Sequence, residues 1–149
     1  MSTWGQFDVA HPELATFGAS CLCRAPAYLG TVRSDGTPRV RPVTPIIGGG
    51  HLFLFMEPTS PKGRDLRERA SYSLHNGVPD NAGTGGEFFL SGAAALIEDE
   101  RMRDLAASAA TYSPADRYIL FELGVTQAGC HGYGDVALPS PTRWQAPAA

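Results

Sequence analysis

The chain has 149 residues, of which 43% are hydrophobic and 18% charged, so we expect one globular domain over residues 1–149. A net charge of −3 and a pI near 5.7 argue against a general nucleic-acid-binding protein, which is usually basic. The first residues lack the basic and apolar regions of a signal peptide, and no apolar run is long enough to cross a bilayer. We therefore expect a cytoplasmic protein without membrane association.

The first half of the chain predicts a helix followed by strands. Residues 11–24 carry apolar side chains at helical spacing. Residues 28–47 contain two β-type runs around Ser34-Asp35-Gly36-Thr37, and Asp-Gly between apolar runs is a strong hairpin signal. The glycines at 48–50 predict a further turn into a strand over residues 51–57. That strand is apolar on both faces, so we expect neither face to meet open water.

A short helix, a strand and a loop are predicted next. Residues 59–70 predict a helix that begins after Ser60, a favourable N-cap, with Pro61 at the first helical position. The alternating residues 71–76 predict a strand. The glycine-rich residues 76–86 predict a surface loop.

The last part of the chain predicts a strand over residues 87–99, in which Gly92 marks a bulge or a close approach of another segment. The other predicted elements are a helix over 98–110, a short helix beginning at Ser113-Pro114, a strand over 118–126 and a short strand around 142–145. Sequential strands joined by hairpins favour an antiparallel sheet that closes, or nearly closes, into a small barrel. The glycine-rich motifs of Rossmann and P-loop proteins are absent.

The three cysteines are an odd number in a chain without secretory features, so we expect free thiols. A zinc site would have to join Cys21, Cys23, Cys130 and His131, whose spacing matches no standard zinc pattern. Cys21 and Cys23 also fall in a predicted helix, where residues two positions apart point to different sides. We therefore expect no metal site.

The segment PRVRPVTP, residues 38–45, places Arg39 and Arg41 on the same face of a predicted strand. Two like charges on one strand face repel each other unless something negative lies between them. The two prolines also favour an edge strand or a bulge. The segment therefore indicates an anion.

The predicted helix after Ser60 carries Lys62 and Arg64 near its first turn, where the helix dipole disfavours cations. A phosphate bound by these cations, by backbone N–H groups and by the Ser60 hydroxyl would explain the pattern. The alternative is that Arg39, Arg41, Lys62 and Arg64 are solvated surface charges, neutralised by Asp65 and Glu68.

The sequence resembles the pyridoxamine 5′-phosphate oxidase-like family of FMN-binding split barrels over roughly residues 12–145. The resemblance rests on YLGTVRSDGTPRVRPVTP, HLFLFMEPTSPKGRDL and GEFFLSGAAALIED, in that order and spacing. It implies a mainly β fold with flanking helices (α+β), an antiparallel split β-barrel of the FMN-binding type. It also implies a homodimer with the cofactor at its interface, which would explain a strand with no wet face.

The resemblance further assigns the cofactor site residue by residue. The implied residues are Arg41, Ser60 and Lys62 as phosphate clamp, Pro42, Val43, Phe55 and Met56 along the isoalloxazine ring, Glu87 where the oxidases carry a flavin-facing Gln, and Trp144 as a cover from the partner subunit. The alternative for Phe53, Phe55 and Met56 is that they are plain core residues, which some of them must be in any case.

Two departures from the oxidases argue against vitamin B6 oxidation. Ile46 stands where the oxidases carry a Lys, and the C-terminal PTRWQAPAA lacks their Arg-x-His pair. Similar short proteins use FMN for other reductions or bind a deazaflavin coenzyme, and either cofactor performs hydride transfer itself. His75 and His131 are the candidates for a proton donor near a ring, and we interpret both as structural.

The leading hypothesis is a homodimeric flavin-dependent oxidoreductase that acts on a small molecule. A second hypothesis is a non-catalytic protein that holds flavin or haem on the same barrel. A third is a small barrel that binds single-stranded nucleic acid through Phe53, Phe55, Arg39 and Arg41, which the acidic pI disfavours, so we expect no nucleic-acid partner.

Overall fold

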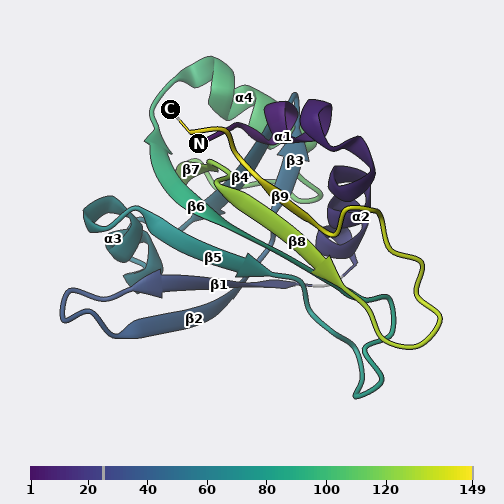
Figure 1. The fold of residues 1–149 in the computed structure, drawn as a ribbon. Coiled ribbons are helices and arrows are strands. Elements are labelled where there is room, and N and C mark those ends of the chain that lie inside the picture. Colours follow the sequence, from purple (N-terminus) through teal and green to yellow (C-terminus); the bar gives the residue numbers. More distant parts are fainter. Residues whose placement is uncertain (25, 149) are drawn as a thin grey trace.

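The computed structural model describes residues 1–24 and 26–148 (Figure 1). In chain order its elements are α1 (Trp4–Ala10), α2 (Pro12–Cys23), β1 (Ala27–Val32), β2 (Pro38–Val43), β3 (Ile46–Gly48), β4 (His51–Met56), α3 (Pro61–Glu68), β5 (Ser71–His75), β6 (Glu87–Ile97), α4 (Glu100–Ala109), β7 (Ile119–Leu123), β8 (Gln127–His131) and β9 (Arg143–Gln145). Each strand pairing among these elements is antiparallel.

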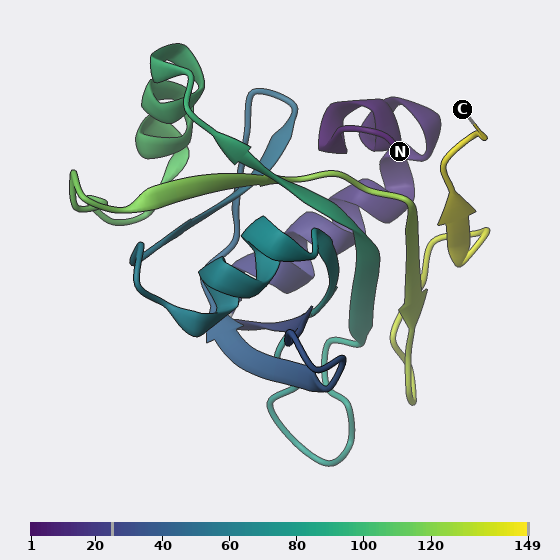
Figure 2. The same ribbon diagram turned by 90° about the vertical axis from the view of Figure 1, so that its left-hand side faces the viewer.

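The 11-residue strand β6 joins two parts of one curved sheet. Its first part pairs with β5 on one side and β8 on the other, and its second part pairs with β7. One part of the sheet therefore has the order β2-β1-β5-β6-β8-β9, and the other continues as β6-β7-β4-β3. Figure 2 shows the sheet curving around α2, which gives the half-barrel predicted from the sequence.

Gly92 lies at the point where β6 passes from one part of the sheet to the other. A Cβ atom at this position would collide with the backbone carbonyl oxygen of Gly124. The predicted close approach at Gly92 is confirmed, because only a residue without a side chain lets the chain after β7 pass so near to β6.

Two helices, α2 and α3, pack on the inner face of the first part of the sheet. The inner face contacts α2 through β6 and β8, and α3 through β1 and β6. The outer face of β2, β1, β5, β6, β8 and β9 has no helix over it in the described residues, and Figure 1 shows this face with the helices behind it. No helix in the described part of the chain has the length and hydropathy needed to span a membrane.

Both faces of β4 are buried inside the single chain. Leu52, Leu54 and Met56 belong to the main core inside the half-barrel. Phe53 and Phe55 belong to a smaller cluster covered by α4, whose Ala106 is fully buried. The strand indeed has no wet face, but the reason is the covering helix, so β4 gives no support to a dimer.

Several local predictions are confirmed. The predicted helix over 11–24 forms as α2, and the turn at 34–37 joins β1 to β2. The β5 and α4 segments form as expected, and β9 is the predicted short strand around 142–145. In β7, Phe121 and Leu123 lie in the main core, as the alternating pattern predicted.

Other predictions are wrong. The strand expected to continue to residue 47 ends at Val43, and the chain then crosses from one edge of the sheet to the other. Thr44 and Pro45 make this break, since Pro45 has no N–H to donate to a ladder. β2 and β4 are therefore not paired as the predicted meander required. No helix begins at Ser113-Pro114, where the described chain forms bends and turns.

Candidate cofactor site

The helix α3 begins where the sequence predicted, and Ser60 is its N-cap. The Ser60 backbone is extended (φ −65°, ψ 137°), and its hydroxyl oxygen accepts a hydrogen bond from the Gly63 N–H at 3.2 Å. Pro61 occupies the first helical position, where a missing N–H costs nothing. The Ser60 hydroxyl keeps its own proton, which is available for donation to a ligand.

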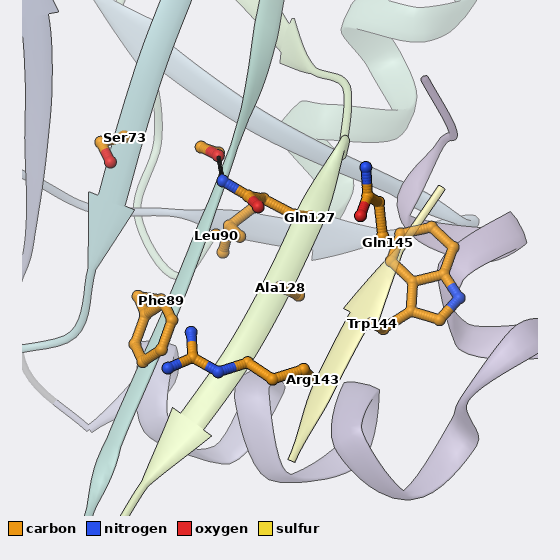
Figure 3. Close-up of a pocket in the computed structure, with 9 residues that line it drawn as sticks. Ser73, Phe89, Leu90, Gln127, Ala128, Arg143, Trp144 and Gln145 are labelled. Carbon is orange, nitrogen blue, oxygen red and sulfur yellow. Dashed lines mark hydrogen bonds between the residues drawn. The ribbon is translucent and has the colours of Figure 1, made fainter. Parts of the chain in front are cut away.

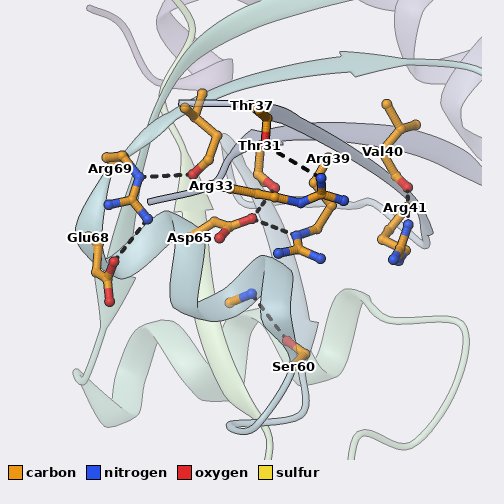
Figure 4. Close-up of polar contacts among 12 residues, drawn as sticks. Thr31, Arg33, Thr37, Arg39, Val40, Arg41, Ser60, Asp65, Glu68 and Arg69 are labelled. Atoms are coloured by element: carbon orange, nitrogen blue, oxygen red, sulfur yellow. Dashed lines mark hydrogen bonds and ion pairs between the residues drawn. The ribbon is translucent and has the colours of Figure 1, made fainter. Parts of the chain in front are cut away.

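Arg39 and Arg41 share the inner face of β2, as predicted, but only Arg41 lacks a carboxylate. Arg39 Nε donates to Asp65 Oδ2 at 2.8 Å, and the Thr31 hydroxyl donates to the same oxygen at 2.7 Å (Figure 4). The Asp65 side chain is 5% exposed, and that of Arg39 is 16% exposed. Arg39 therefore holds β2 against α3, and its charge is neutralised by Asp65 as the alternative of balanced surface charges predicted, which leaves Arg41 as the cation of β2 for an anion site.

The Asp65 carboxylate is kept ionised by these partners. Burial alone would raise its pKa, but the hydrogen bonds from Arg39 and Thr31 outweigh burial and bring the pKa below the ordinary 3.8. Glu68, the second carboxylate of α3, accepts from Arg69 at 2.9 Å. Both acidic groups that could have neutralised the nearby cations are thus paired with residues other than Arg41 and Lys62.

Arg41 and Lys62 form a pair of cations without a counter-ion in the described residues. Arg41 is exposed and donates from Nη1 to the Val40 carbonyl oxygen at 2.8 Å. The pKa of Lys62 is lowered, first by its partial burial and second by the nearby charge of Arg41. The Lys62 ammonium also opposes the positive end of the α3 dipole. This cation pair is costly for the protein alone and suits a bound anion.

The predicted ring contacts lie on β2, under the start of α3 and in the cluster under α4. Pro42 is exposed and Val43 is buried, both directly after Arg41 on β2. Met56 lies under the first turn of α3, where its sulfur would be 3.1 Å from a Cβ at Gly63. Phe55 is 9% exposed, and the Arg103 guanidinium lies 5.2 Å above its ring. Pro42 therefore lies on the outer face of β2, opposite to Arg41, and Val43 shares the inner face with Arg41. Met56 lies beneath the start of α3, and Phe55 lies in the cluster under α4.

No protein-family model and no curated protein matches this sequence. Solved structures do match its fold. A haem-binding protein from Mycobacterium smegmatis aligns with a TM-score of 0.65 and 22% identity over 82% of this chain and 54% of that one, so this chain spans about half of that protein. A NimC/NimA family protein from Clostridium acetobutylicum aligns with a TM-score of 0.61 and 19% identity, covering 85% of this chain and 88% of that one.

A Listeria innocua protein provisionally described as a pyridoxamine 5′-phosphate oxidase aligns with a TM-score of 0.59 and 17% identity. The alignment covers 75% of this chain and 93% of that one. The chain has the split-barrel fold of these proteins. The resemblance stated from the sequence is thereby confirmed for the fold.

Within one copy of the split barrel, Glu87 and Trp144 lie away from the cation pair. Glu87 begins β6, three strands from β2, which is about 14 Å at the usual strand spacing. Trp144 packs on Phe7 with ring centroids 4.9 Å apart, so its ring is part of the core of its own chain. Their predicted contacts with a flavin would require a second copy of the chain.

The split barrel also holds a polar cluster that the sequence did not reveal. His75 Nε2 lies 2.9 Å from Glu87 Oε1, and His75 Nδ1 lies 2.6 Å from the Asn76 carbonyl oxygen. Burial would raise the pKa of Glu87, but hydrogen bonds from His75 and Tyr133 outweigh it and lower the pKa. His75 and Glu87 are 12 residues apart, and only the pairing of β5 with β6 brings them together.

The three cysteines of the split barrel are free thiols. Cys21 and Cys130 are buried and Cys23 is exposed, and burial raises the pKa of both buried thiols. Residues 1–24 and 26–148 contain no group of three or more His, Cys, Asp or Glu side chains arranged to hold a metal ion.

Proposed function

We propose that this split barrel binds FMN, with Arg41 and Lys62 holding the flavin phosphate. The observation that supports this function is the cation pair itself, which has no carboxylate in the described residues although Arg39 beside it has one. The N–H groups of the first turn of α3 and the Ser60 hydroxyl add donors at the same place. The residues present therefore fit a phosphate group.

A bound flavin would supply hydride transfer, so we propose an oxidoreductase that acts on a small molecule. The chain's own contribution is to bind and orient the cofactor. Val43, which follows Arg41 on the inner face of β2, and Met56, under the first turn of α3, are the apolar side chains on the side of the sheet that carries the cation pair. A deazaflavin coenzyme presents similar phosphate chemistry and is the alternative cofactor, which would make the protein a deazaflavin-dependent reductase.

Haem binding without turnover is the second candidate function. Its support is the fold shared with the haem-binding protein of Mycobacterium smegmatis and the exposed imidazole of His131, whose ring lies edge-on to Tyr133 at 4.8 Å. His75 suits haem less well, because both of its ring nitrogens already lie at hydrogen-bond distance from oxygen atoms. The visible spectrum of the purified protein separates the two cofactors.

We also propose a homodimer with the cofactor sites between subunits. Since α4 covers β4 inside each chain, the support for this assembly comes from the outer face of β1 and β2. Tyr28 and Val40 are 47% and 58% exposed there, and they share that face with Val32, Pro38 and Pro42. A second copy with the same apolar surface would remove these side chains from water.

The test of the phosphate assignment compares FMN with riboflavin, which lacks the phosphate. Arg41→Ala and Lys62→Ala should each weaken FMN binding by about one to two decades, since a charge-assisted hydrogen bond contributes roughly 1.5–3 kcal/mol. Riboflavin affinity should barely change. Arg67→Ala, an exposed cation in the last turn of α3, is the matched control and should affect neither ligand.

Quenching of flavin fluorescence gives the affinities, and thermal unfolding checks them independently. FMN at a hundredfold excess over its dissociation constant should stabilise the wild type by about 2.7 kcal/mol. Equal losses for FMN and riboflavin would mean that the substitutions disturb the fold. An absence of both quenching and stabilisation would reject flavin binding.

A further inference from the structure

A cavity lies on the outer face of the sheet, over β5, β6, β8 and β9 (Figure 3). Its volume is about 480 Å³, within the range of small-molecule sites. Polar side chains from four strands line it, among them Ser73, Ser91, Gln127, Arg143 and Gln145. The cation pair of Arg41 and Lys62 belongs to β2 and α3, so the cavity is a separate place on the molecule.

Arg143 is the charged group of this cavity, and the sheet holds it in place. Its guanidinium lies 4.7 Å from the centroid of the Phe89 ring, across the strand β8. Gly129 lies between them, where a Cβ atom would come within 2.8 Å of the Phe89 ring and 2.9 Å of the Arg143 side chain. The glycine therefore leaves the space that lets Arg143 reach the aromatic ring.

The charge of Arg143 is not neutralised in the described residues. No carboxylate lies within ion-pair distance of it, and none of the residues that line the cavity is acidic. Glu87, on the same face of β6, is paired with His75. A chain with a net charge of −3 thus presents a locally positive cavity, which favours an anion.

The remaining polar groups fit the edge of a flat ligand. Gln127 Nε2 donates to the Ser91 hydroxyl at 3.1 Å, the side-chain hydrogen bond drawn as a dashed line in Figure 3. That bond leaves the Gln127 carbonyl oxygen, the Gln145 amide and the Ser73 hydroxyl to face the cavity. Phe89 supplies aromatic surface to the cavity (Figure 3), whereas the ring of Trp144 packs on Phe7 on the inner face.

We propose that this cavity binds a planar aromatic carboxylate. The carboxylate pairs with the Arg143 guanidinium, which offers two parallel N–H donors. The ligand ring lies against the edge of Phe89, whose faces are covered by Arg143 and by His75, and presents its own edge to Gln127 and Gln145. This ligand is different from the flavin, and its binding does not depend on the cation pair at α3.

The experiment measures binding of quinaldate and of its neutral amide, quinaldamide, by isothermal titration calorimetry. Quinaldate should bind the wild-type protein at least tenfold more tightly than quinaldamide, because only the acid pairs with Arg143. Arg143→Gln should remove this difference and leave FMN affinity unchanged. Gly129→Ala should weaken quinaldate binding by displacing the guanidinium, whereas Arg67→Gln, at an exposed arginine of α3, should have no effect.

Equal affinity for acid and amide, or an unchanged preference in Arg143→Gln, would overturn the proposal. Sedimentation of the same variants tests the alternative that this face forms a contact between subunits. If neither compound binds and Arg143→Gln changes the oligomeric state, the cavity is a contact between subunits and the proposal is wrong. Loss of FMN binding in Arg41→Ala with quinaldate binding intact would show that the two sites are independent, as expected.

Discussion

Arg39 and Arg41 are two residues apart on one face of β2, and we predict opposite consequences from the same substitution at each. Arg39→Gln removes the partner of a carboxylate that is 5% exposed. Arg41→Gln removes an exposed cation whose one hydrogen bond is to the neighbouring Val40 carbonyl. The first should therefore lower the free energy of unfolding of the protein without ligand, and the second should affect ligand binding alone.

Breaking a buried ion pair by removing one partner costs about 3–5 kcal/mol. We take the lower end, about 3 kcal/mol, because Arg39 remains partly exposed at 16% and water can reach the vacated place. For a chain of this length each kcal/mol shifts Tm by about 3 °C, so Arg39→Gln should lower Tm by about 10 °C. Arg41→Gln should stay within about 0.5 kcal/mol of the wild type, as surface substitutions do.

The effect of Arg39→Gln should also depend on pH. The wild-type Asp65 pKa is held below 3.8, so its ion pair contributes stability above that pH, and the contribution is lost as pH falls through the native pKa. In the variant the Asp65 carboxylate stays buried without Arg39, and its pKa rises. The stability difference between variant and wild type should therefore be largest near neutral pH and shrink below about pH 4.

Urea unfolding followed by circular dichroism gives both free energies at each pH. A double variant, Arg39→Met with Asp65→Leu, is the control, because replacing both charges avoids a buried carboxylate and should cost less than Arg39→Gln alone. If Arg39→Gln and Arg41→Gln change stability equally, or if the Arg39→Gln penalty is independent of pH, the division into a structural and a ligand-binding arginine is incorrect.

Two further predictions concern the sheet and the assembly. Gly92→Ala should destabilise the protein by more than about 3 kcal/mol in urea unfolding, because its methyl group would collide with backbone, whereas Gly30→Ala, whose Cβ would have its nearest neighbour at 3.5 Å, should be tolerated. Val40→Glu should convert the proposed dimer to monomer in sedimentation velocity, and Val9→Glu on α1 should not, although Val9 is even more exposed at 86%. A dimer unaffected by Val40→Glu would place the interface elsewhere.

The elements that the sequence predicted are those with local signals. The Asp35-Gly36 turn, the Ser60 cap and the alternating residues of β7 each depend on neighbours within a few positions. The helix α1 carried such a signal that our sequence analysis did not use, since Thr3 and Gln6 form a capping box. β8 offered none, because QAGCH has a glycine in its centre and no regular alternation.

The candidate site was predicted only in part. Which cations remain unpaired depends on contacts between residues that are distant in the sequence. The sequence showed the pattern of cations. Asp65 is 26 residues from Arg39, however, and from the sequence its carboxylate could have paired with any of these cations. The apolar faces of β4 indicated burial correctly, yet the sequence did not reveal that α4, more than 40 residues later, provides it. Local sequence patterns therefore identify which charged and apolar residues are present, and the structure shows which of them are in contact.

The distribution of carboxylates around α3 argues that the cation pair is retained for a ligand. The alternative of a solvated and neutralised surface required Asp65 and Glu68 to balance the nearby cations. Asp65 instead lies with Arg39 and Thr31 under the sheet, and Glu68 lies with Arg69 at the far end of the helix. Lys62 then lies against the positive end of the helix dipole. Its pKa is lowered, first by partial burial and second by the charge of Arg41. One carboxylate in the first turn of α3 would relieve the repulsion, and its place is taken by Pro61, Lys62 and Gly63. Two unpaired cations at this place are unfavourable for the protein alone. Such an arrangement is expected at a site where a bound anion neutralises the cations.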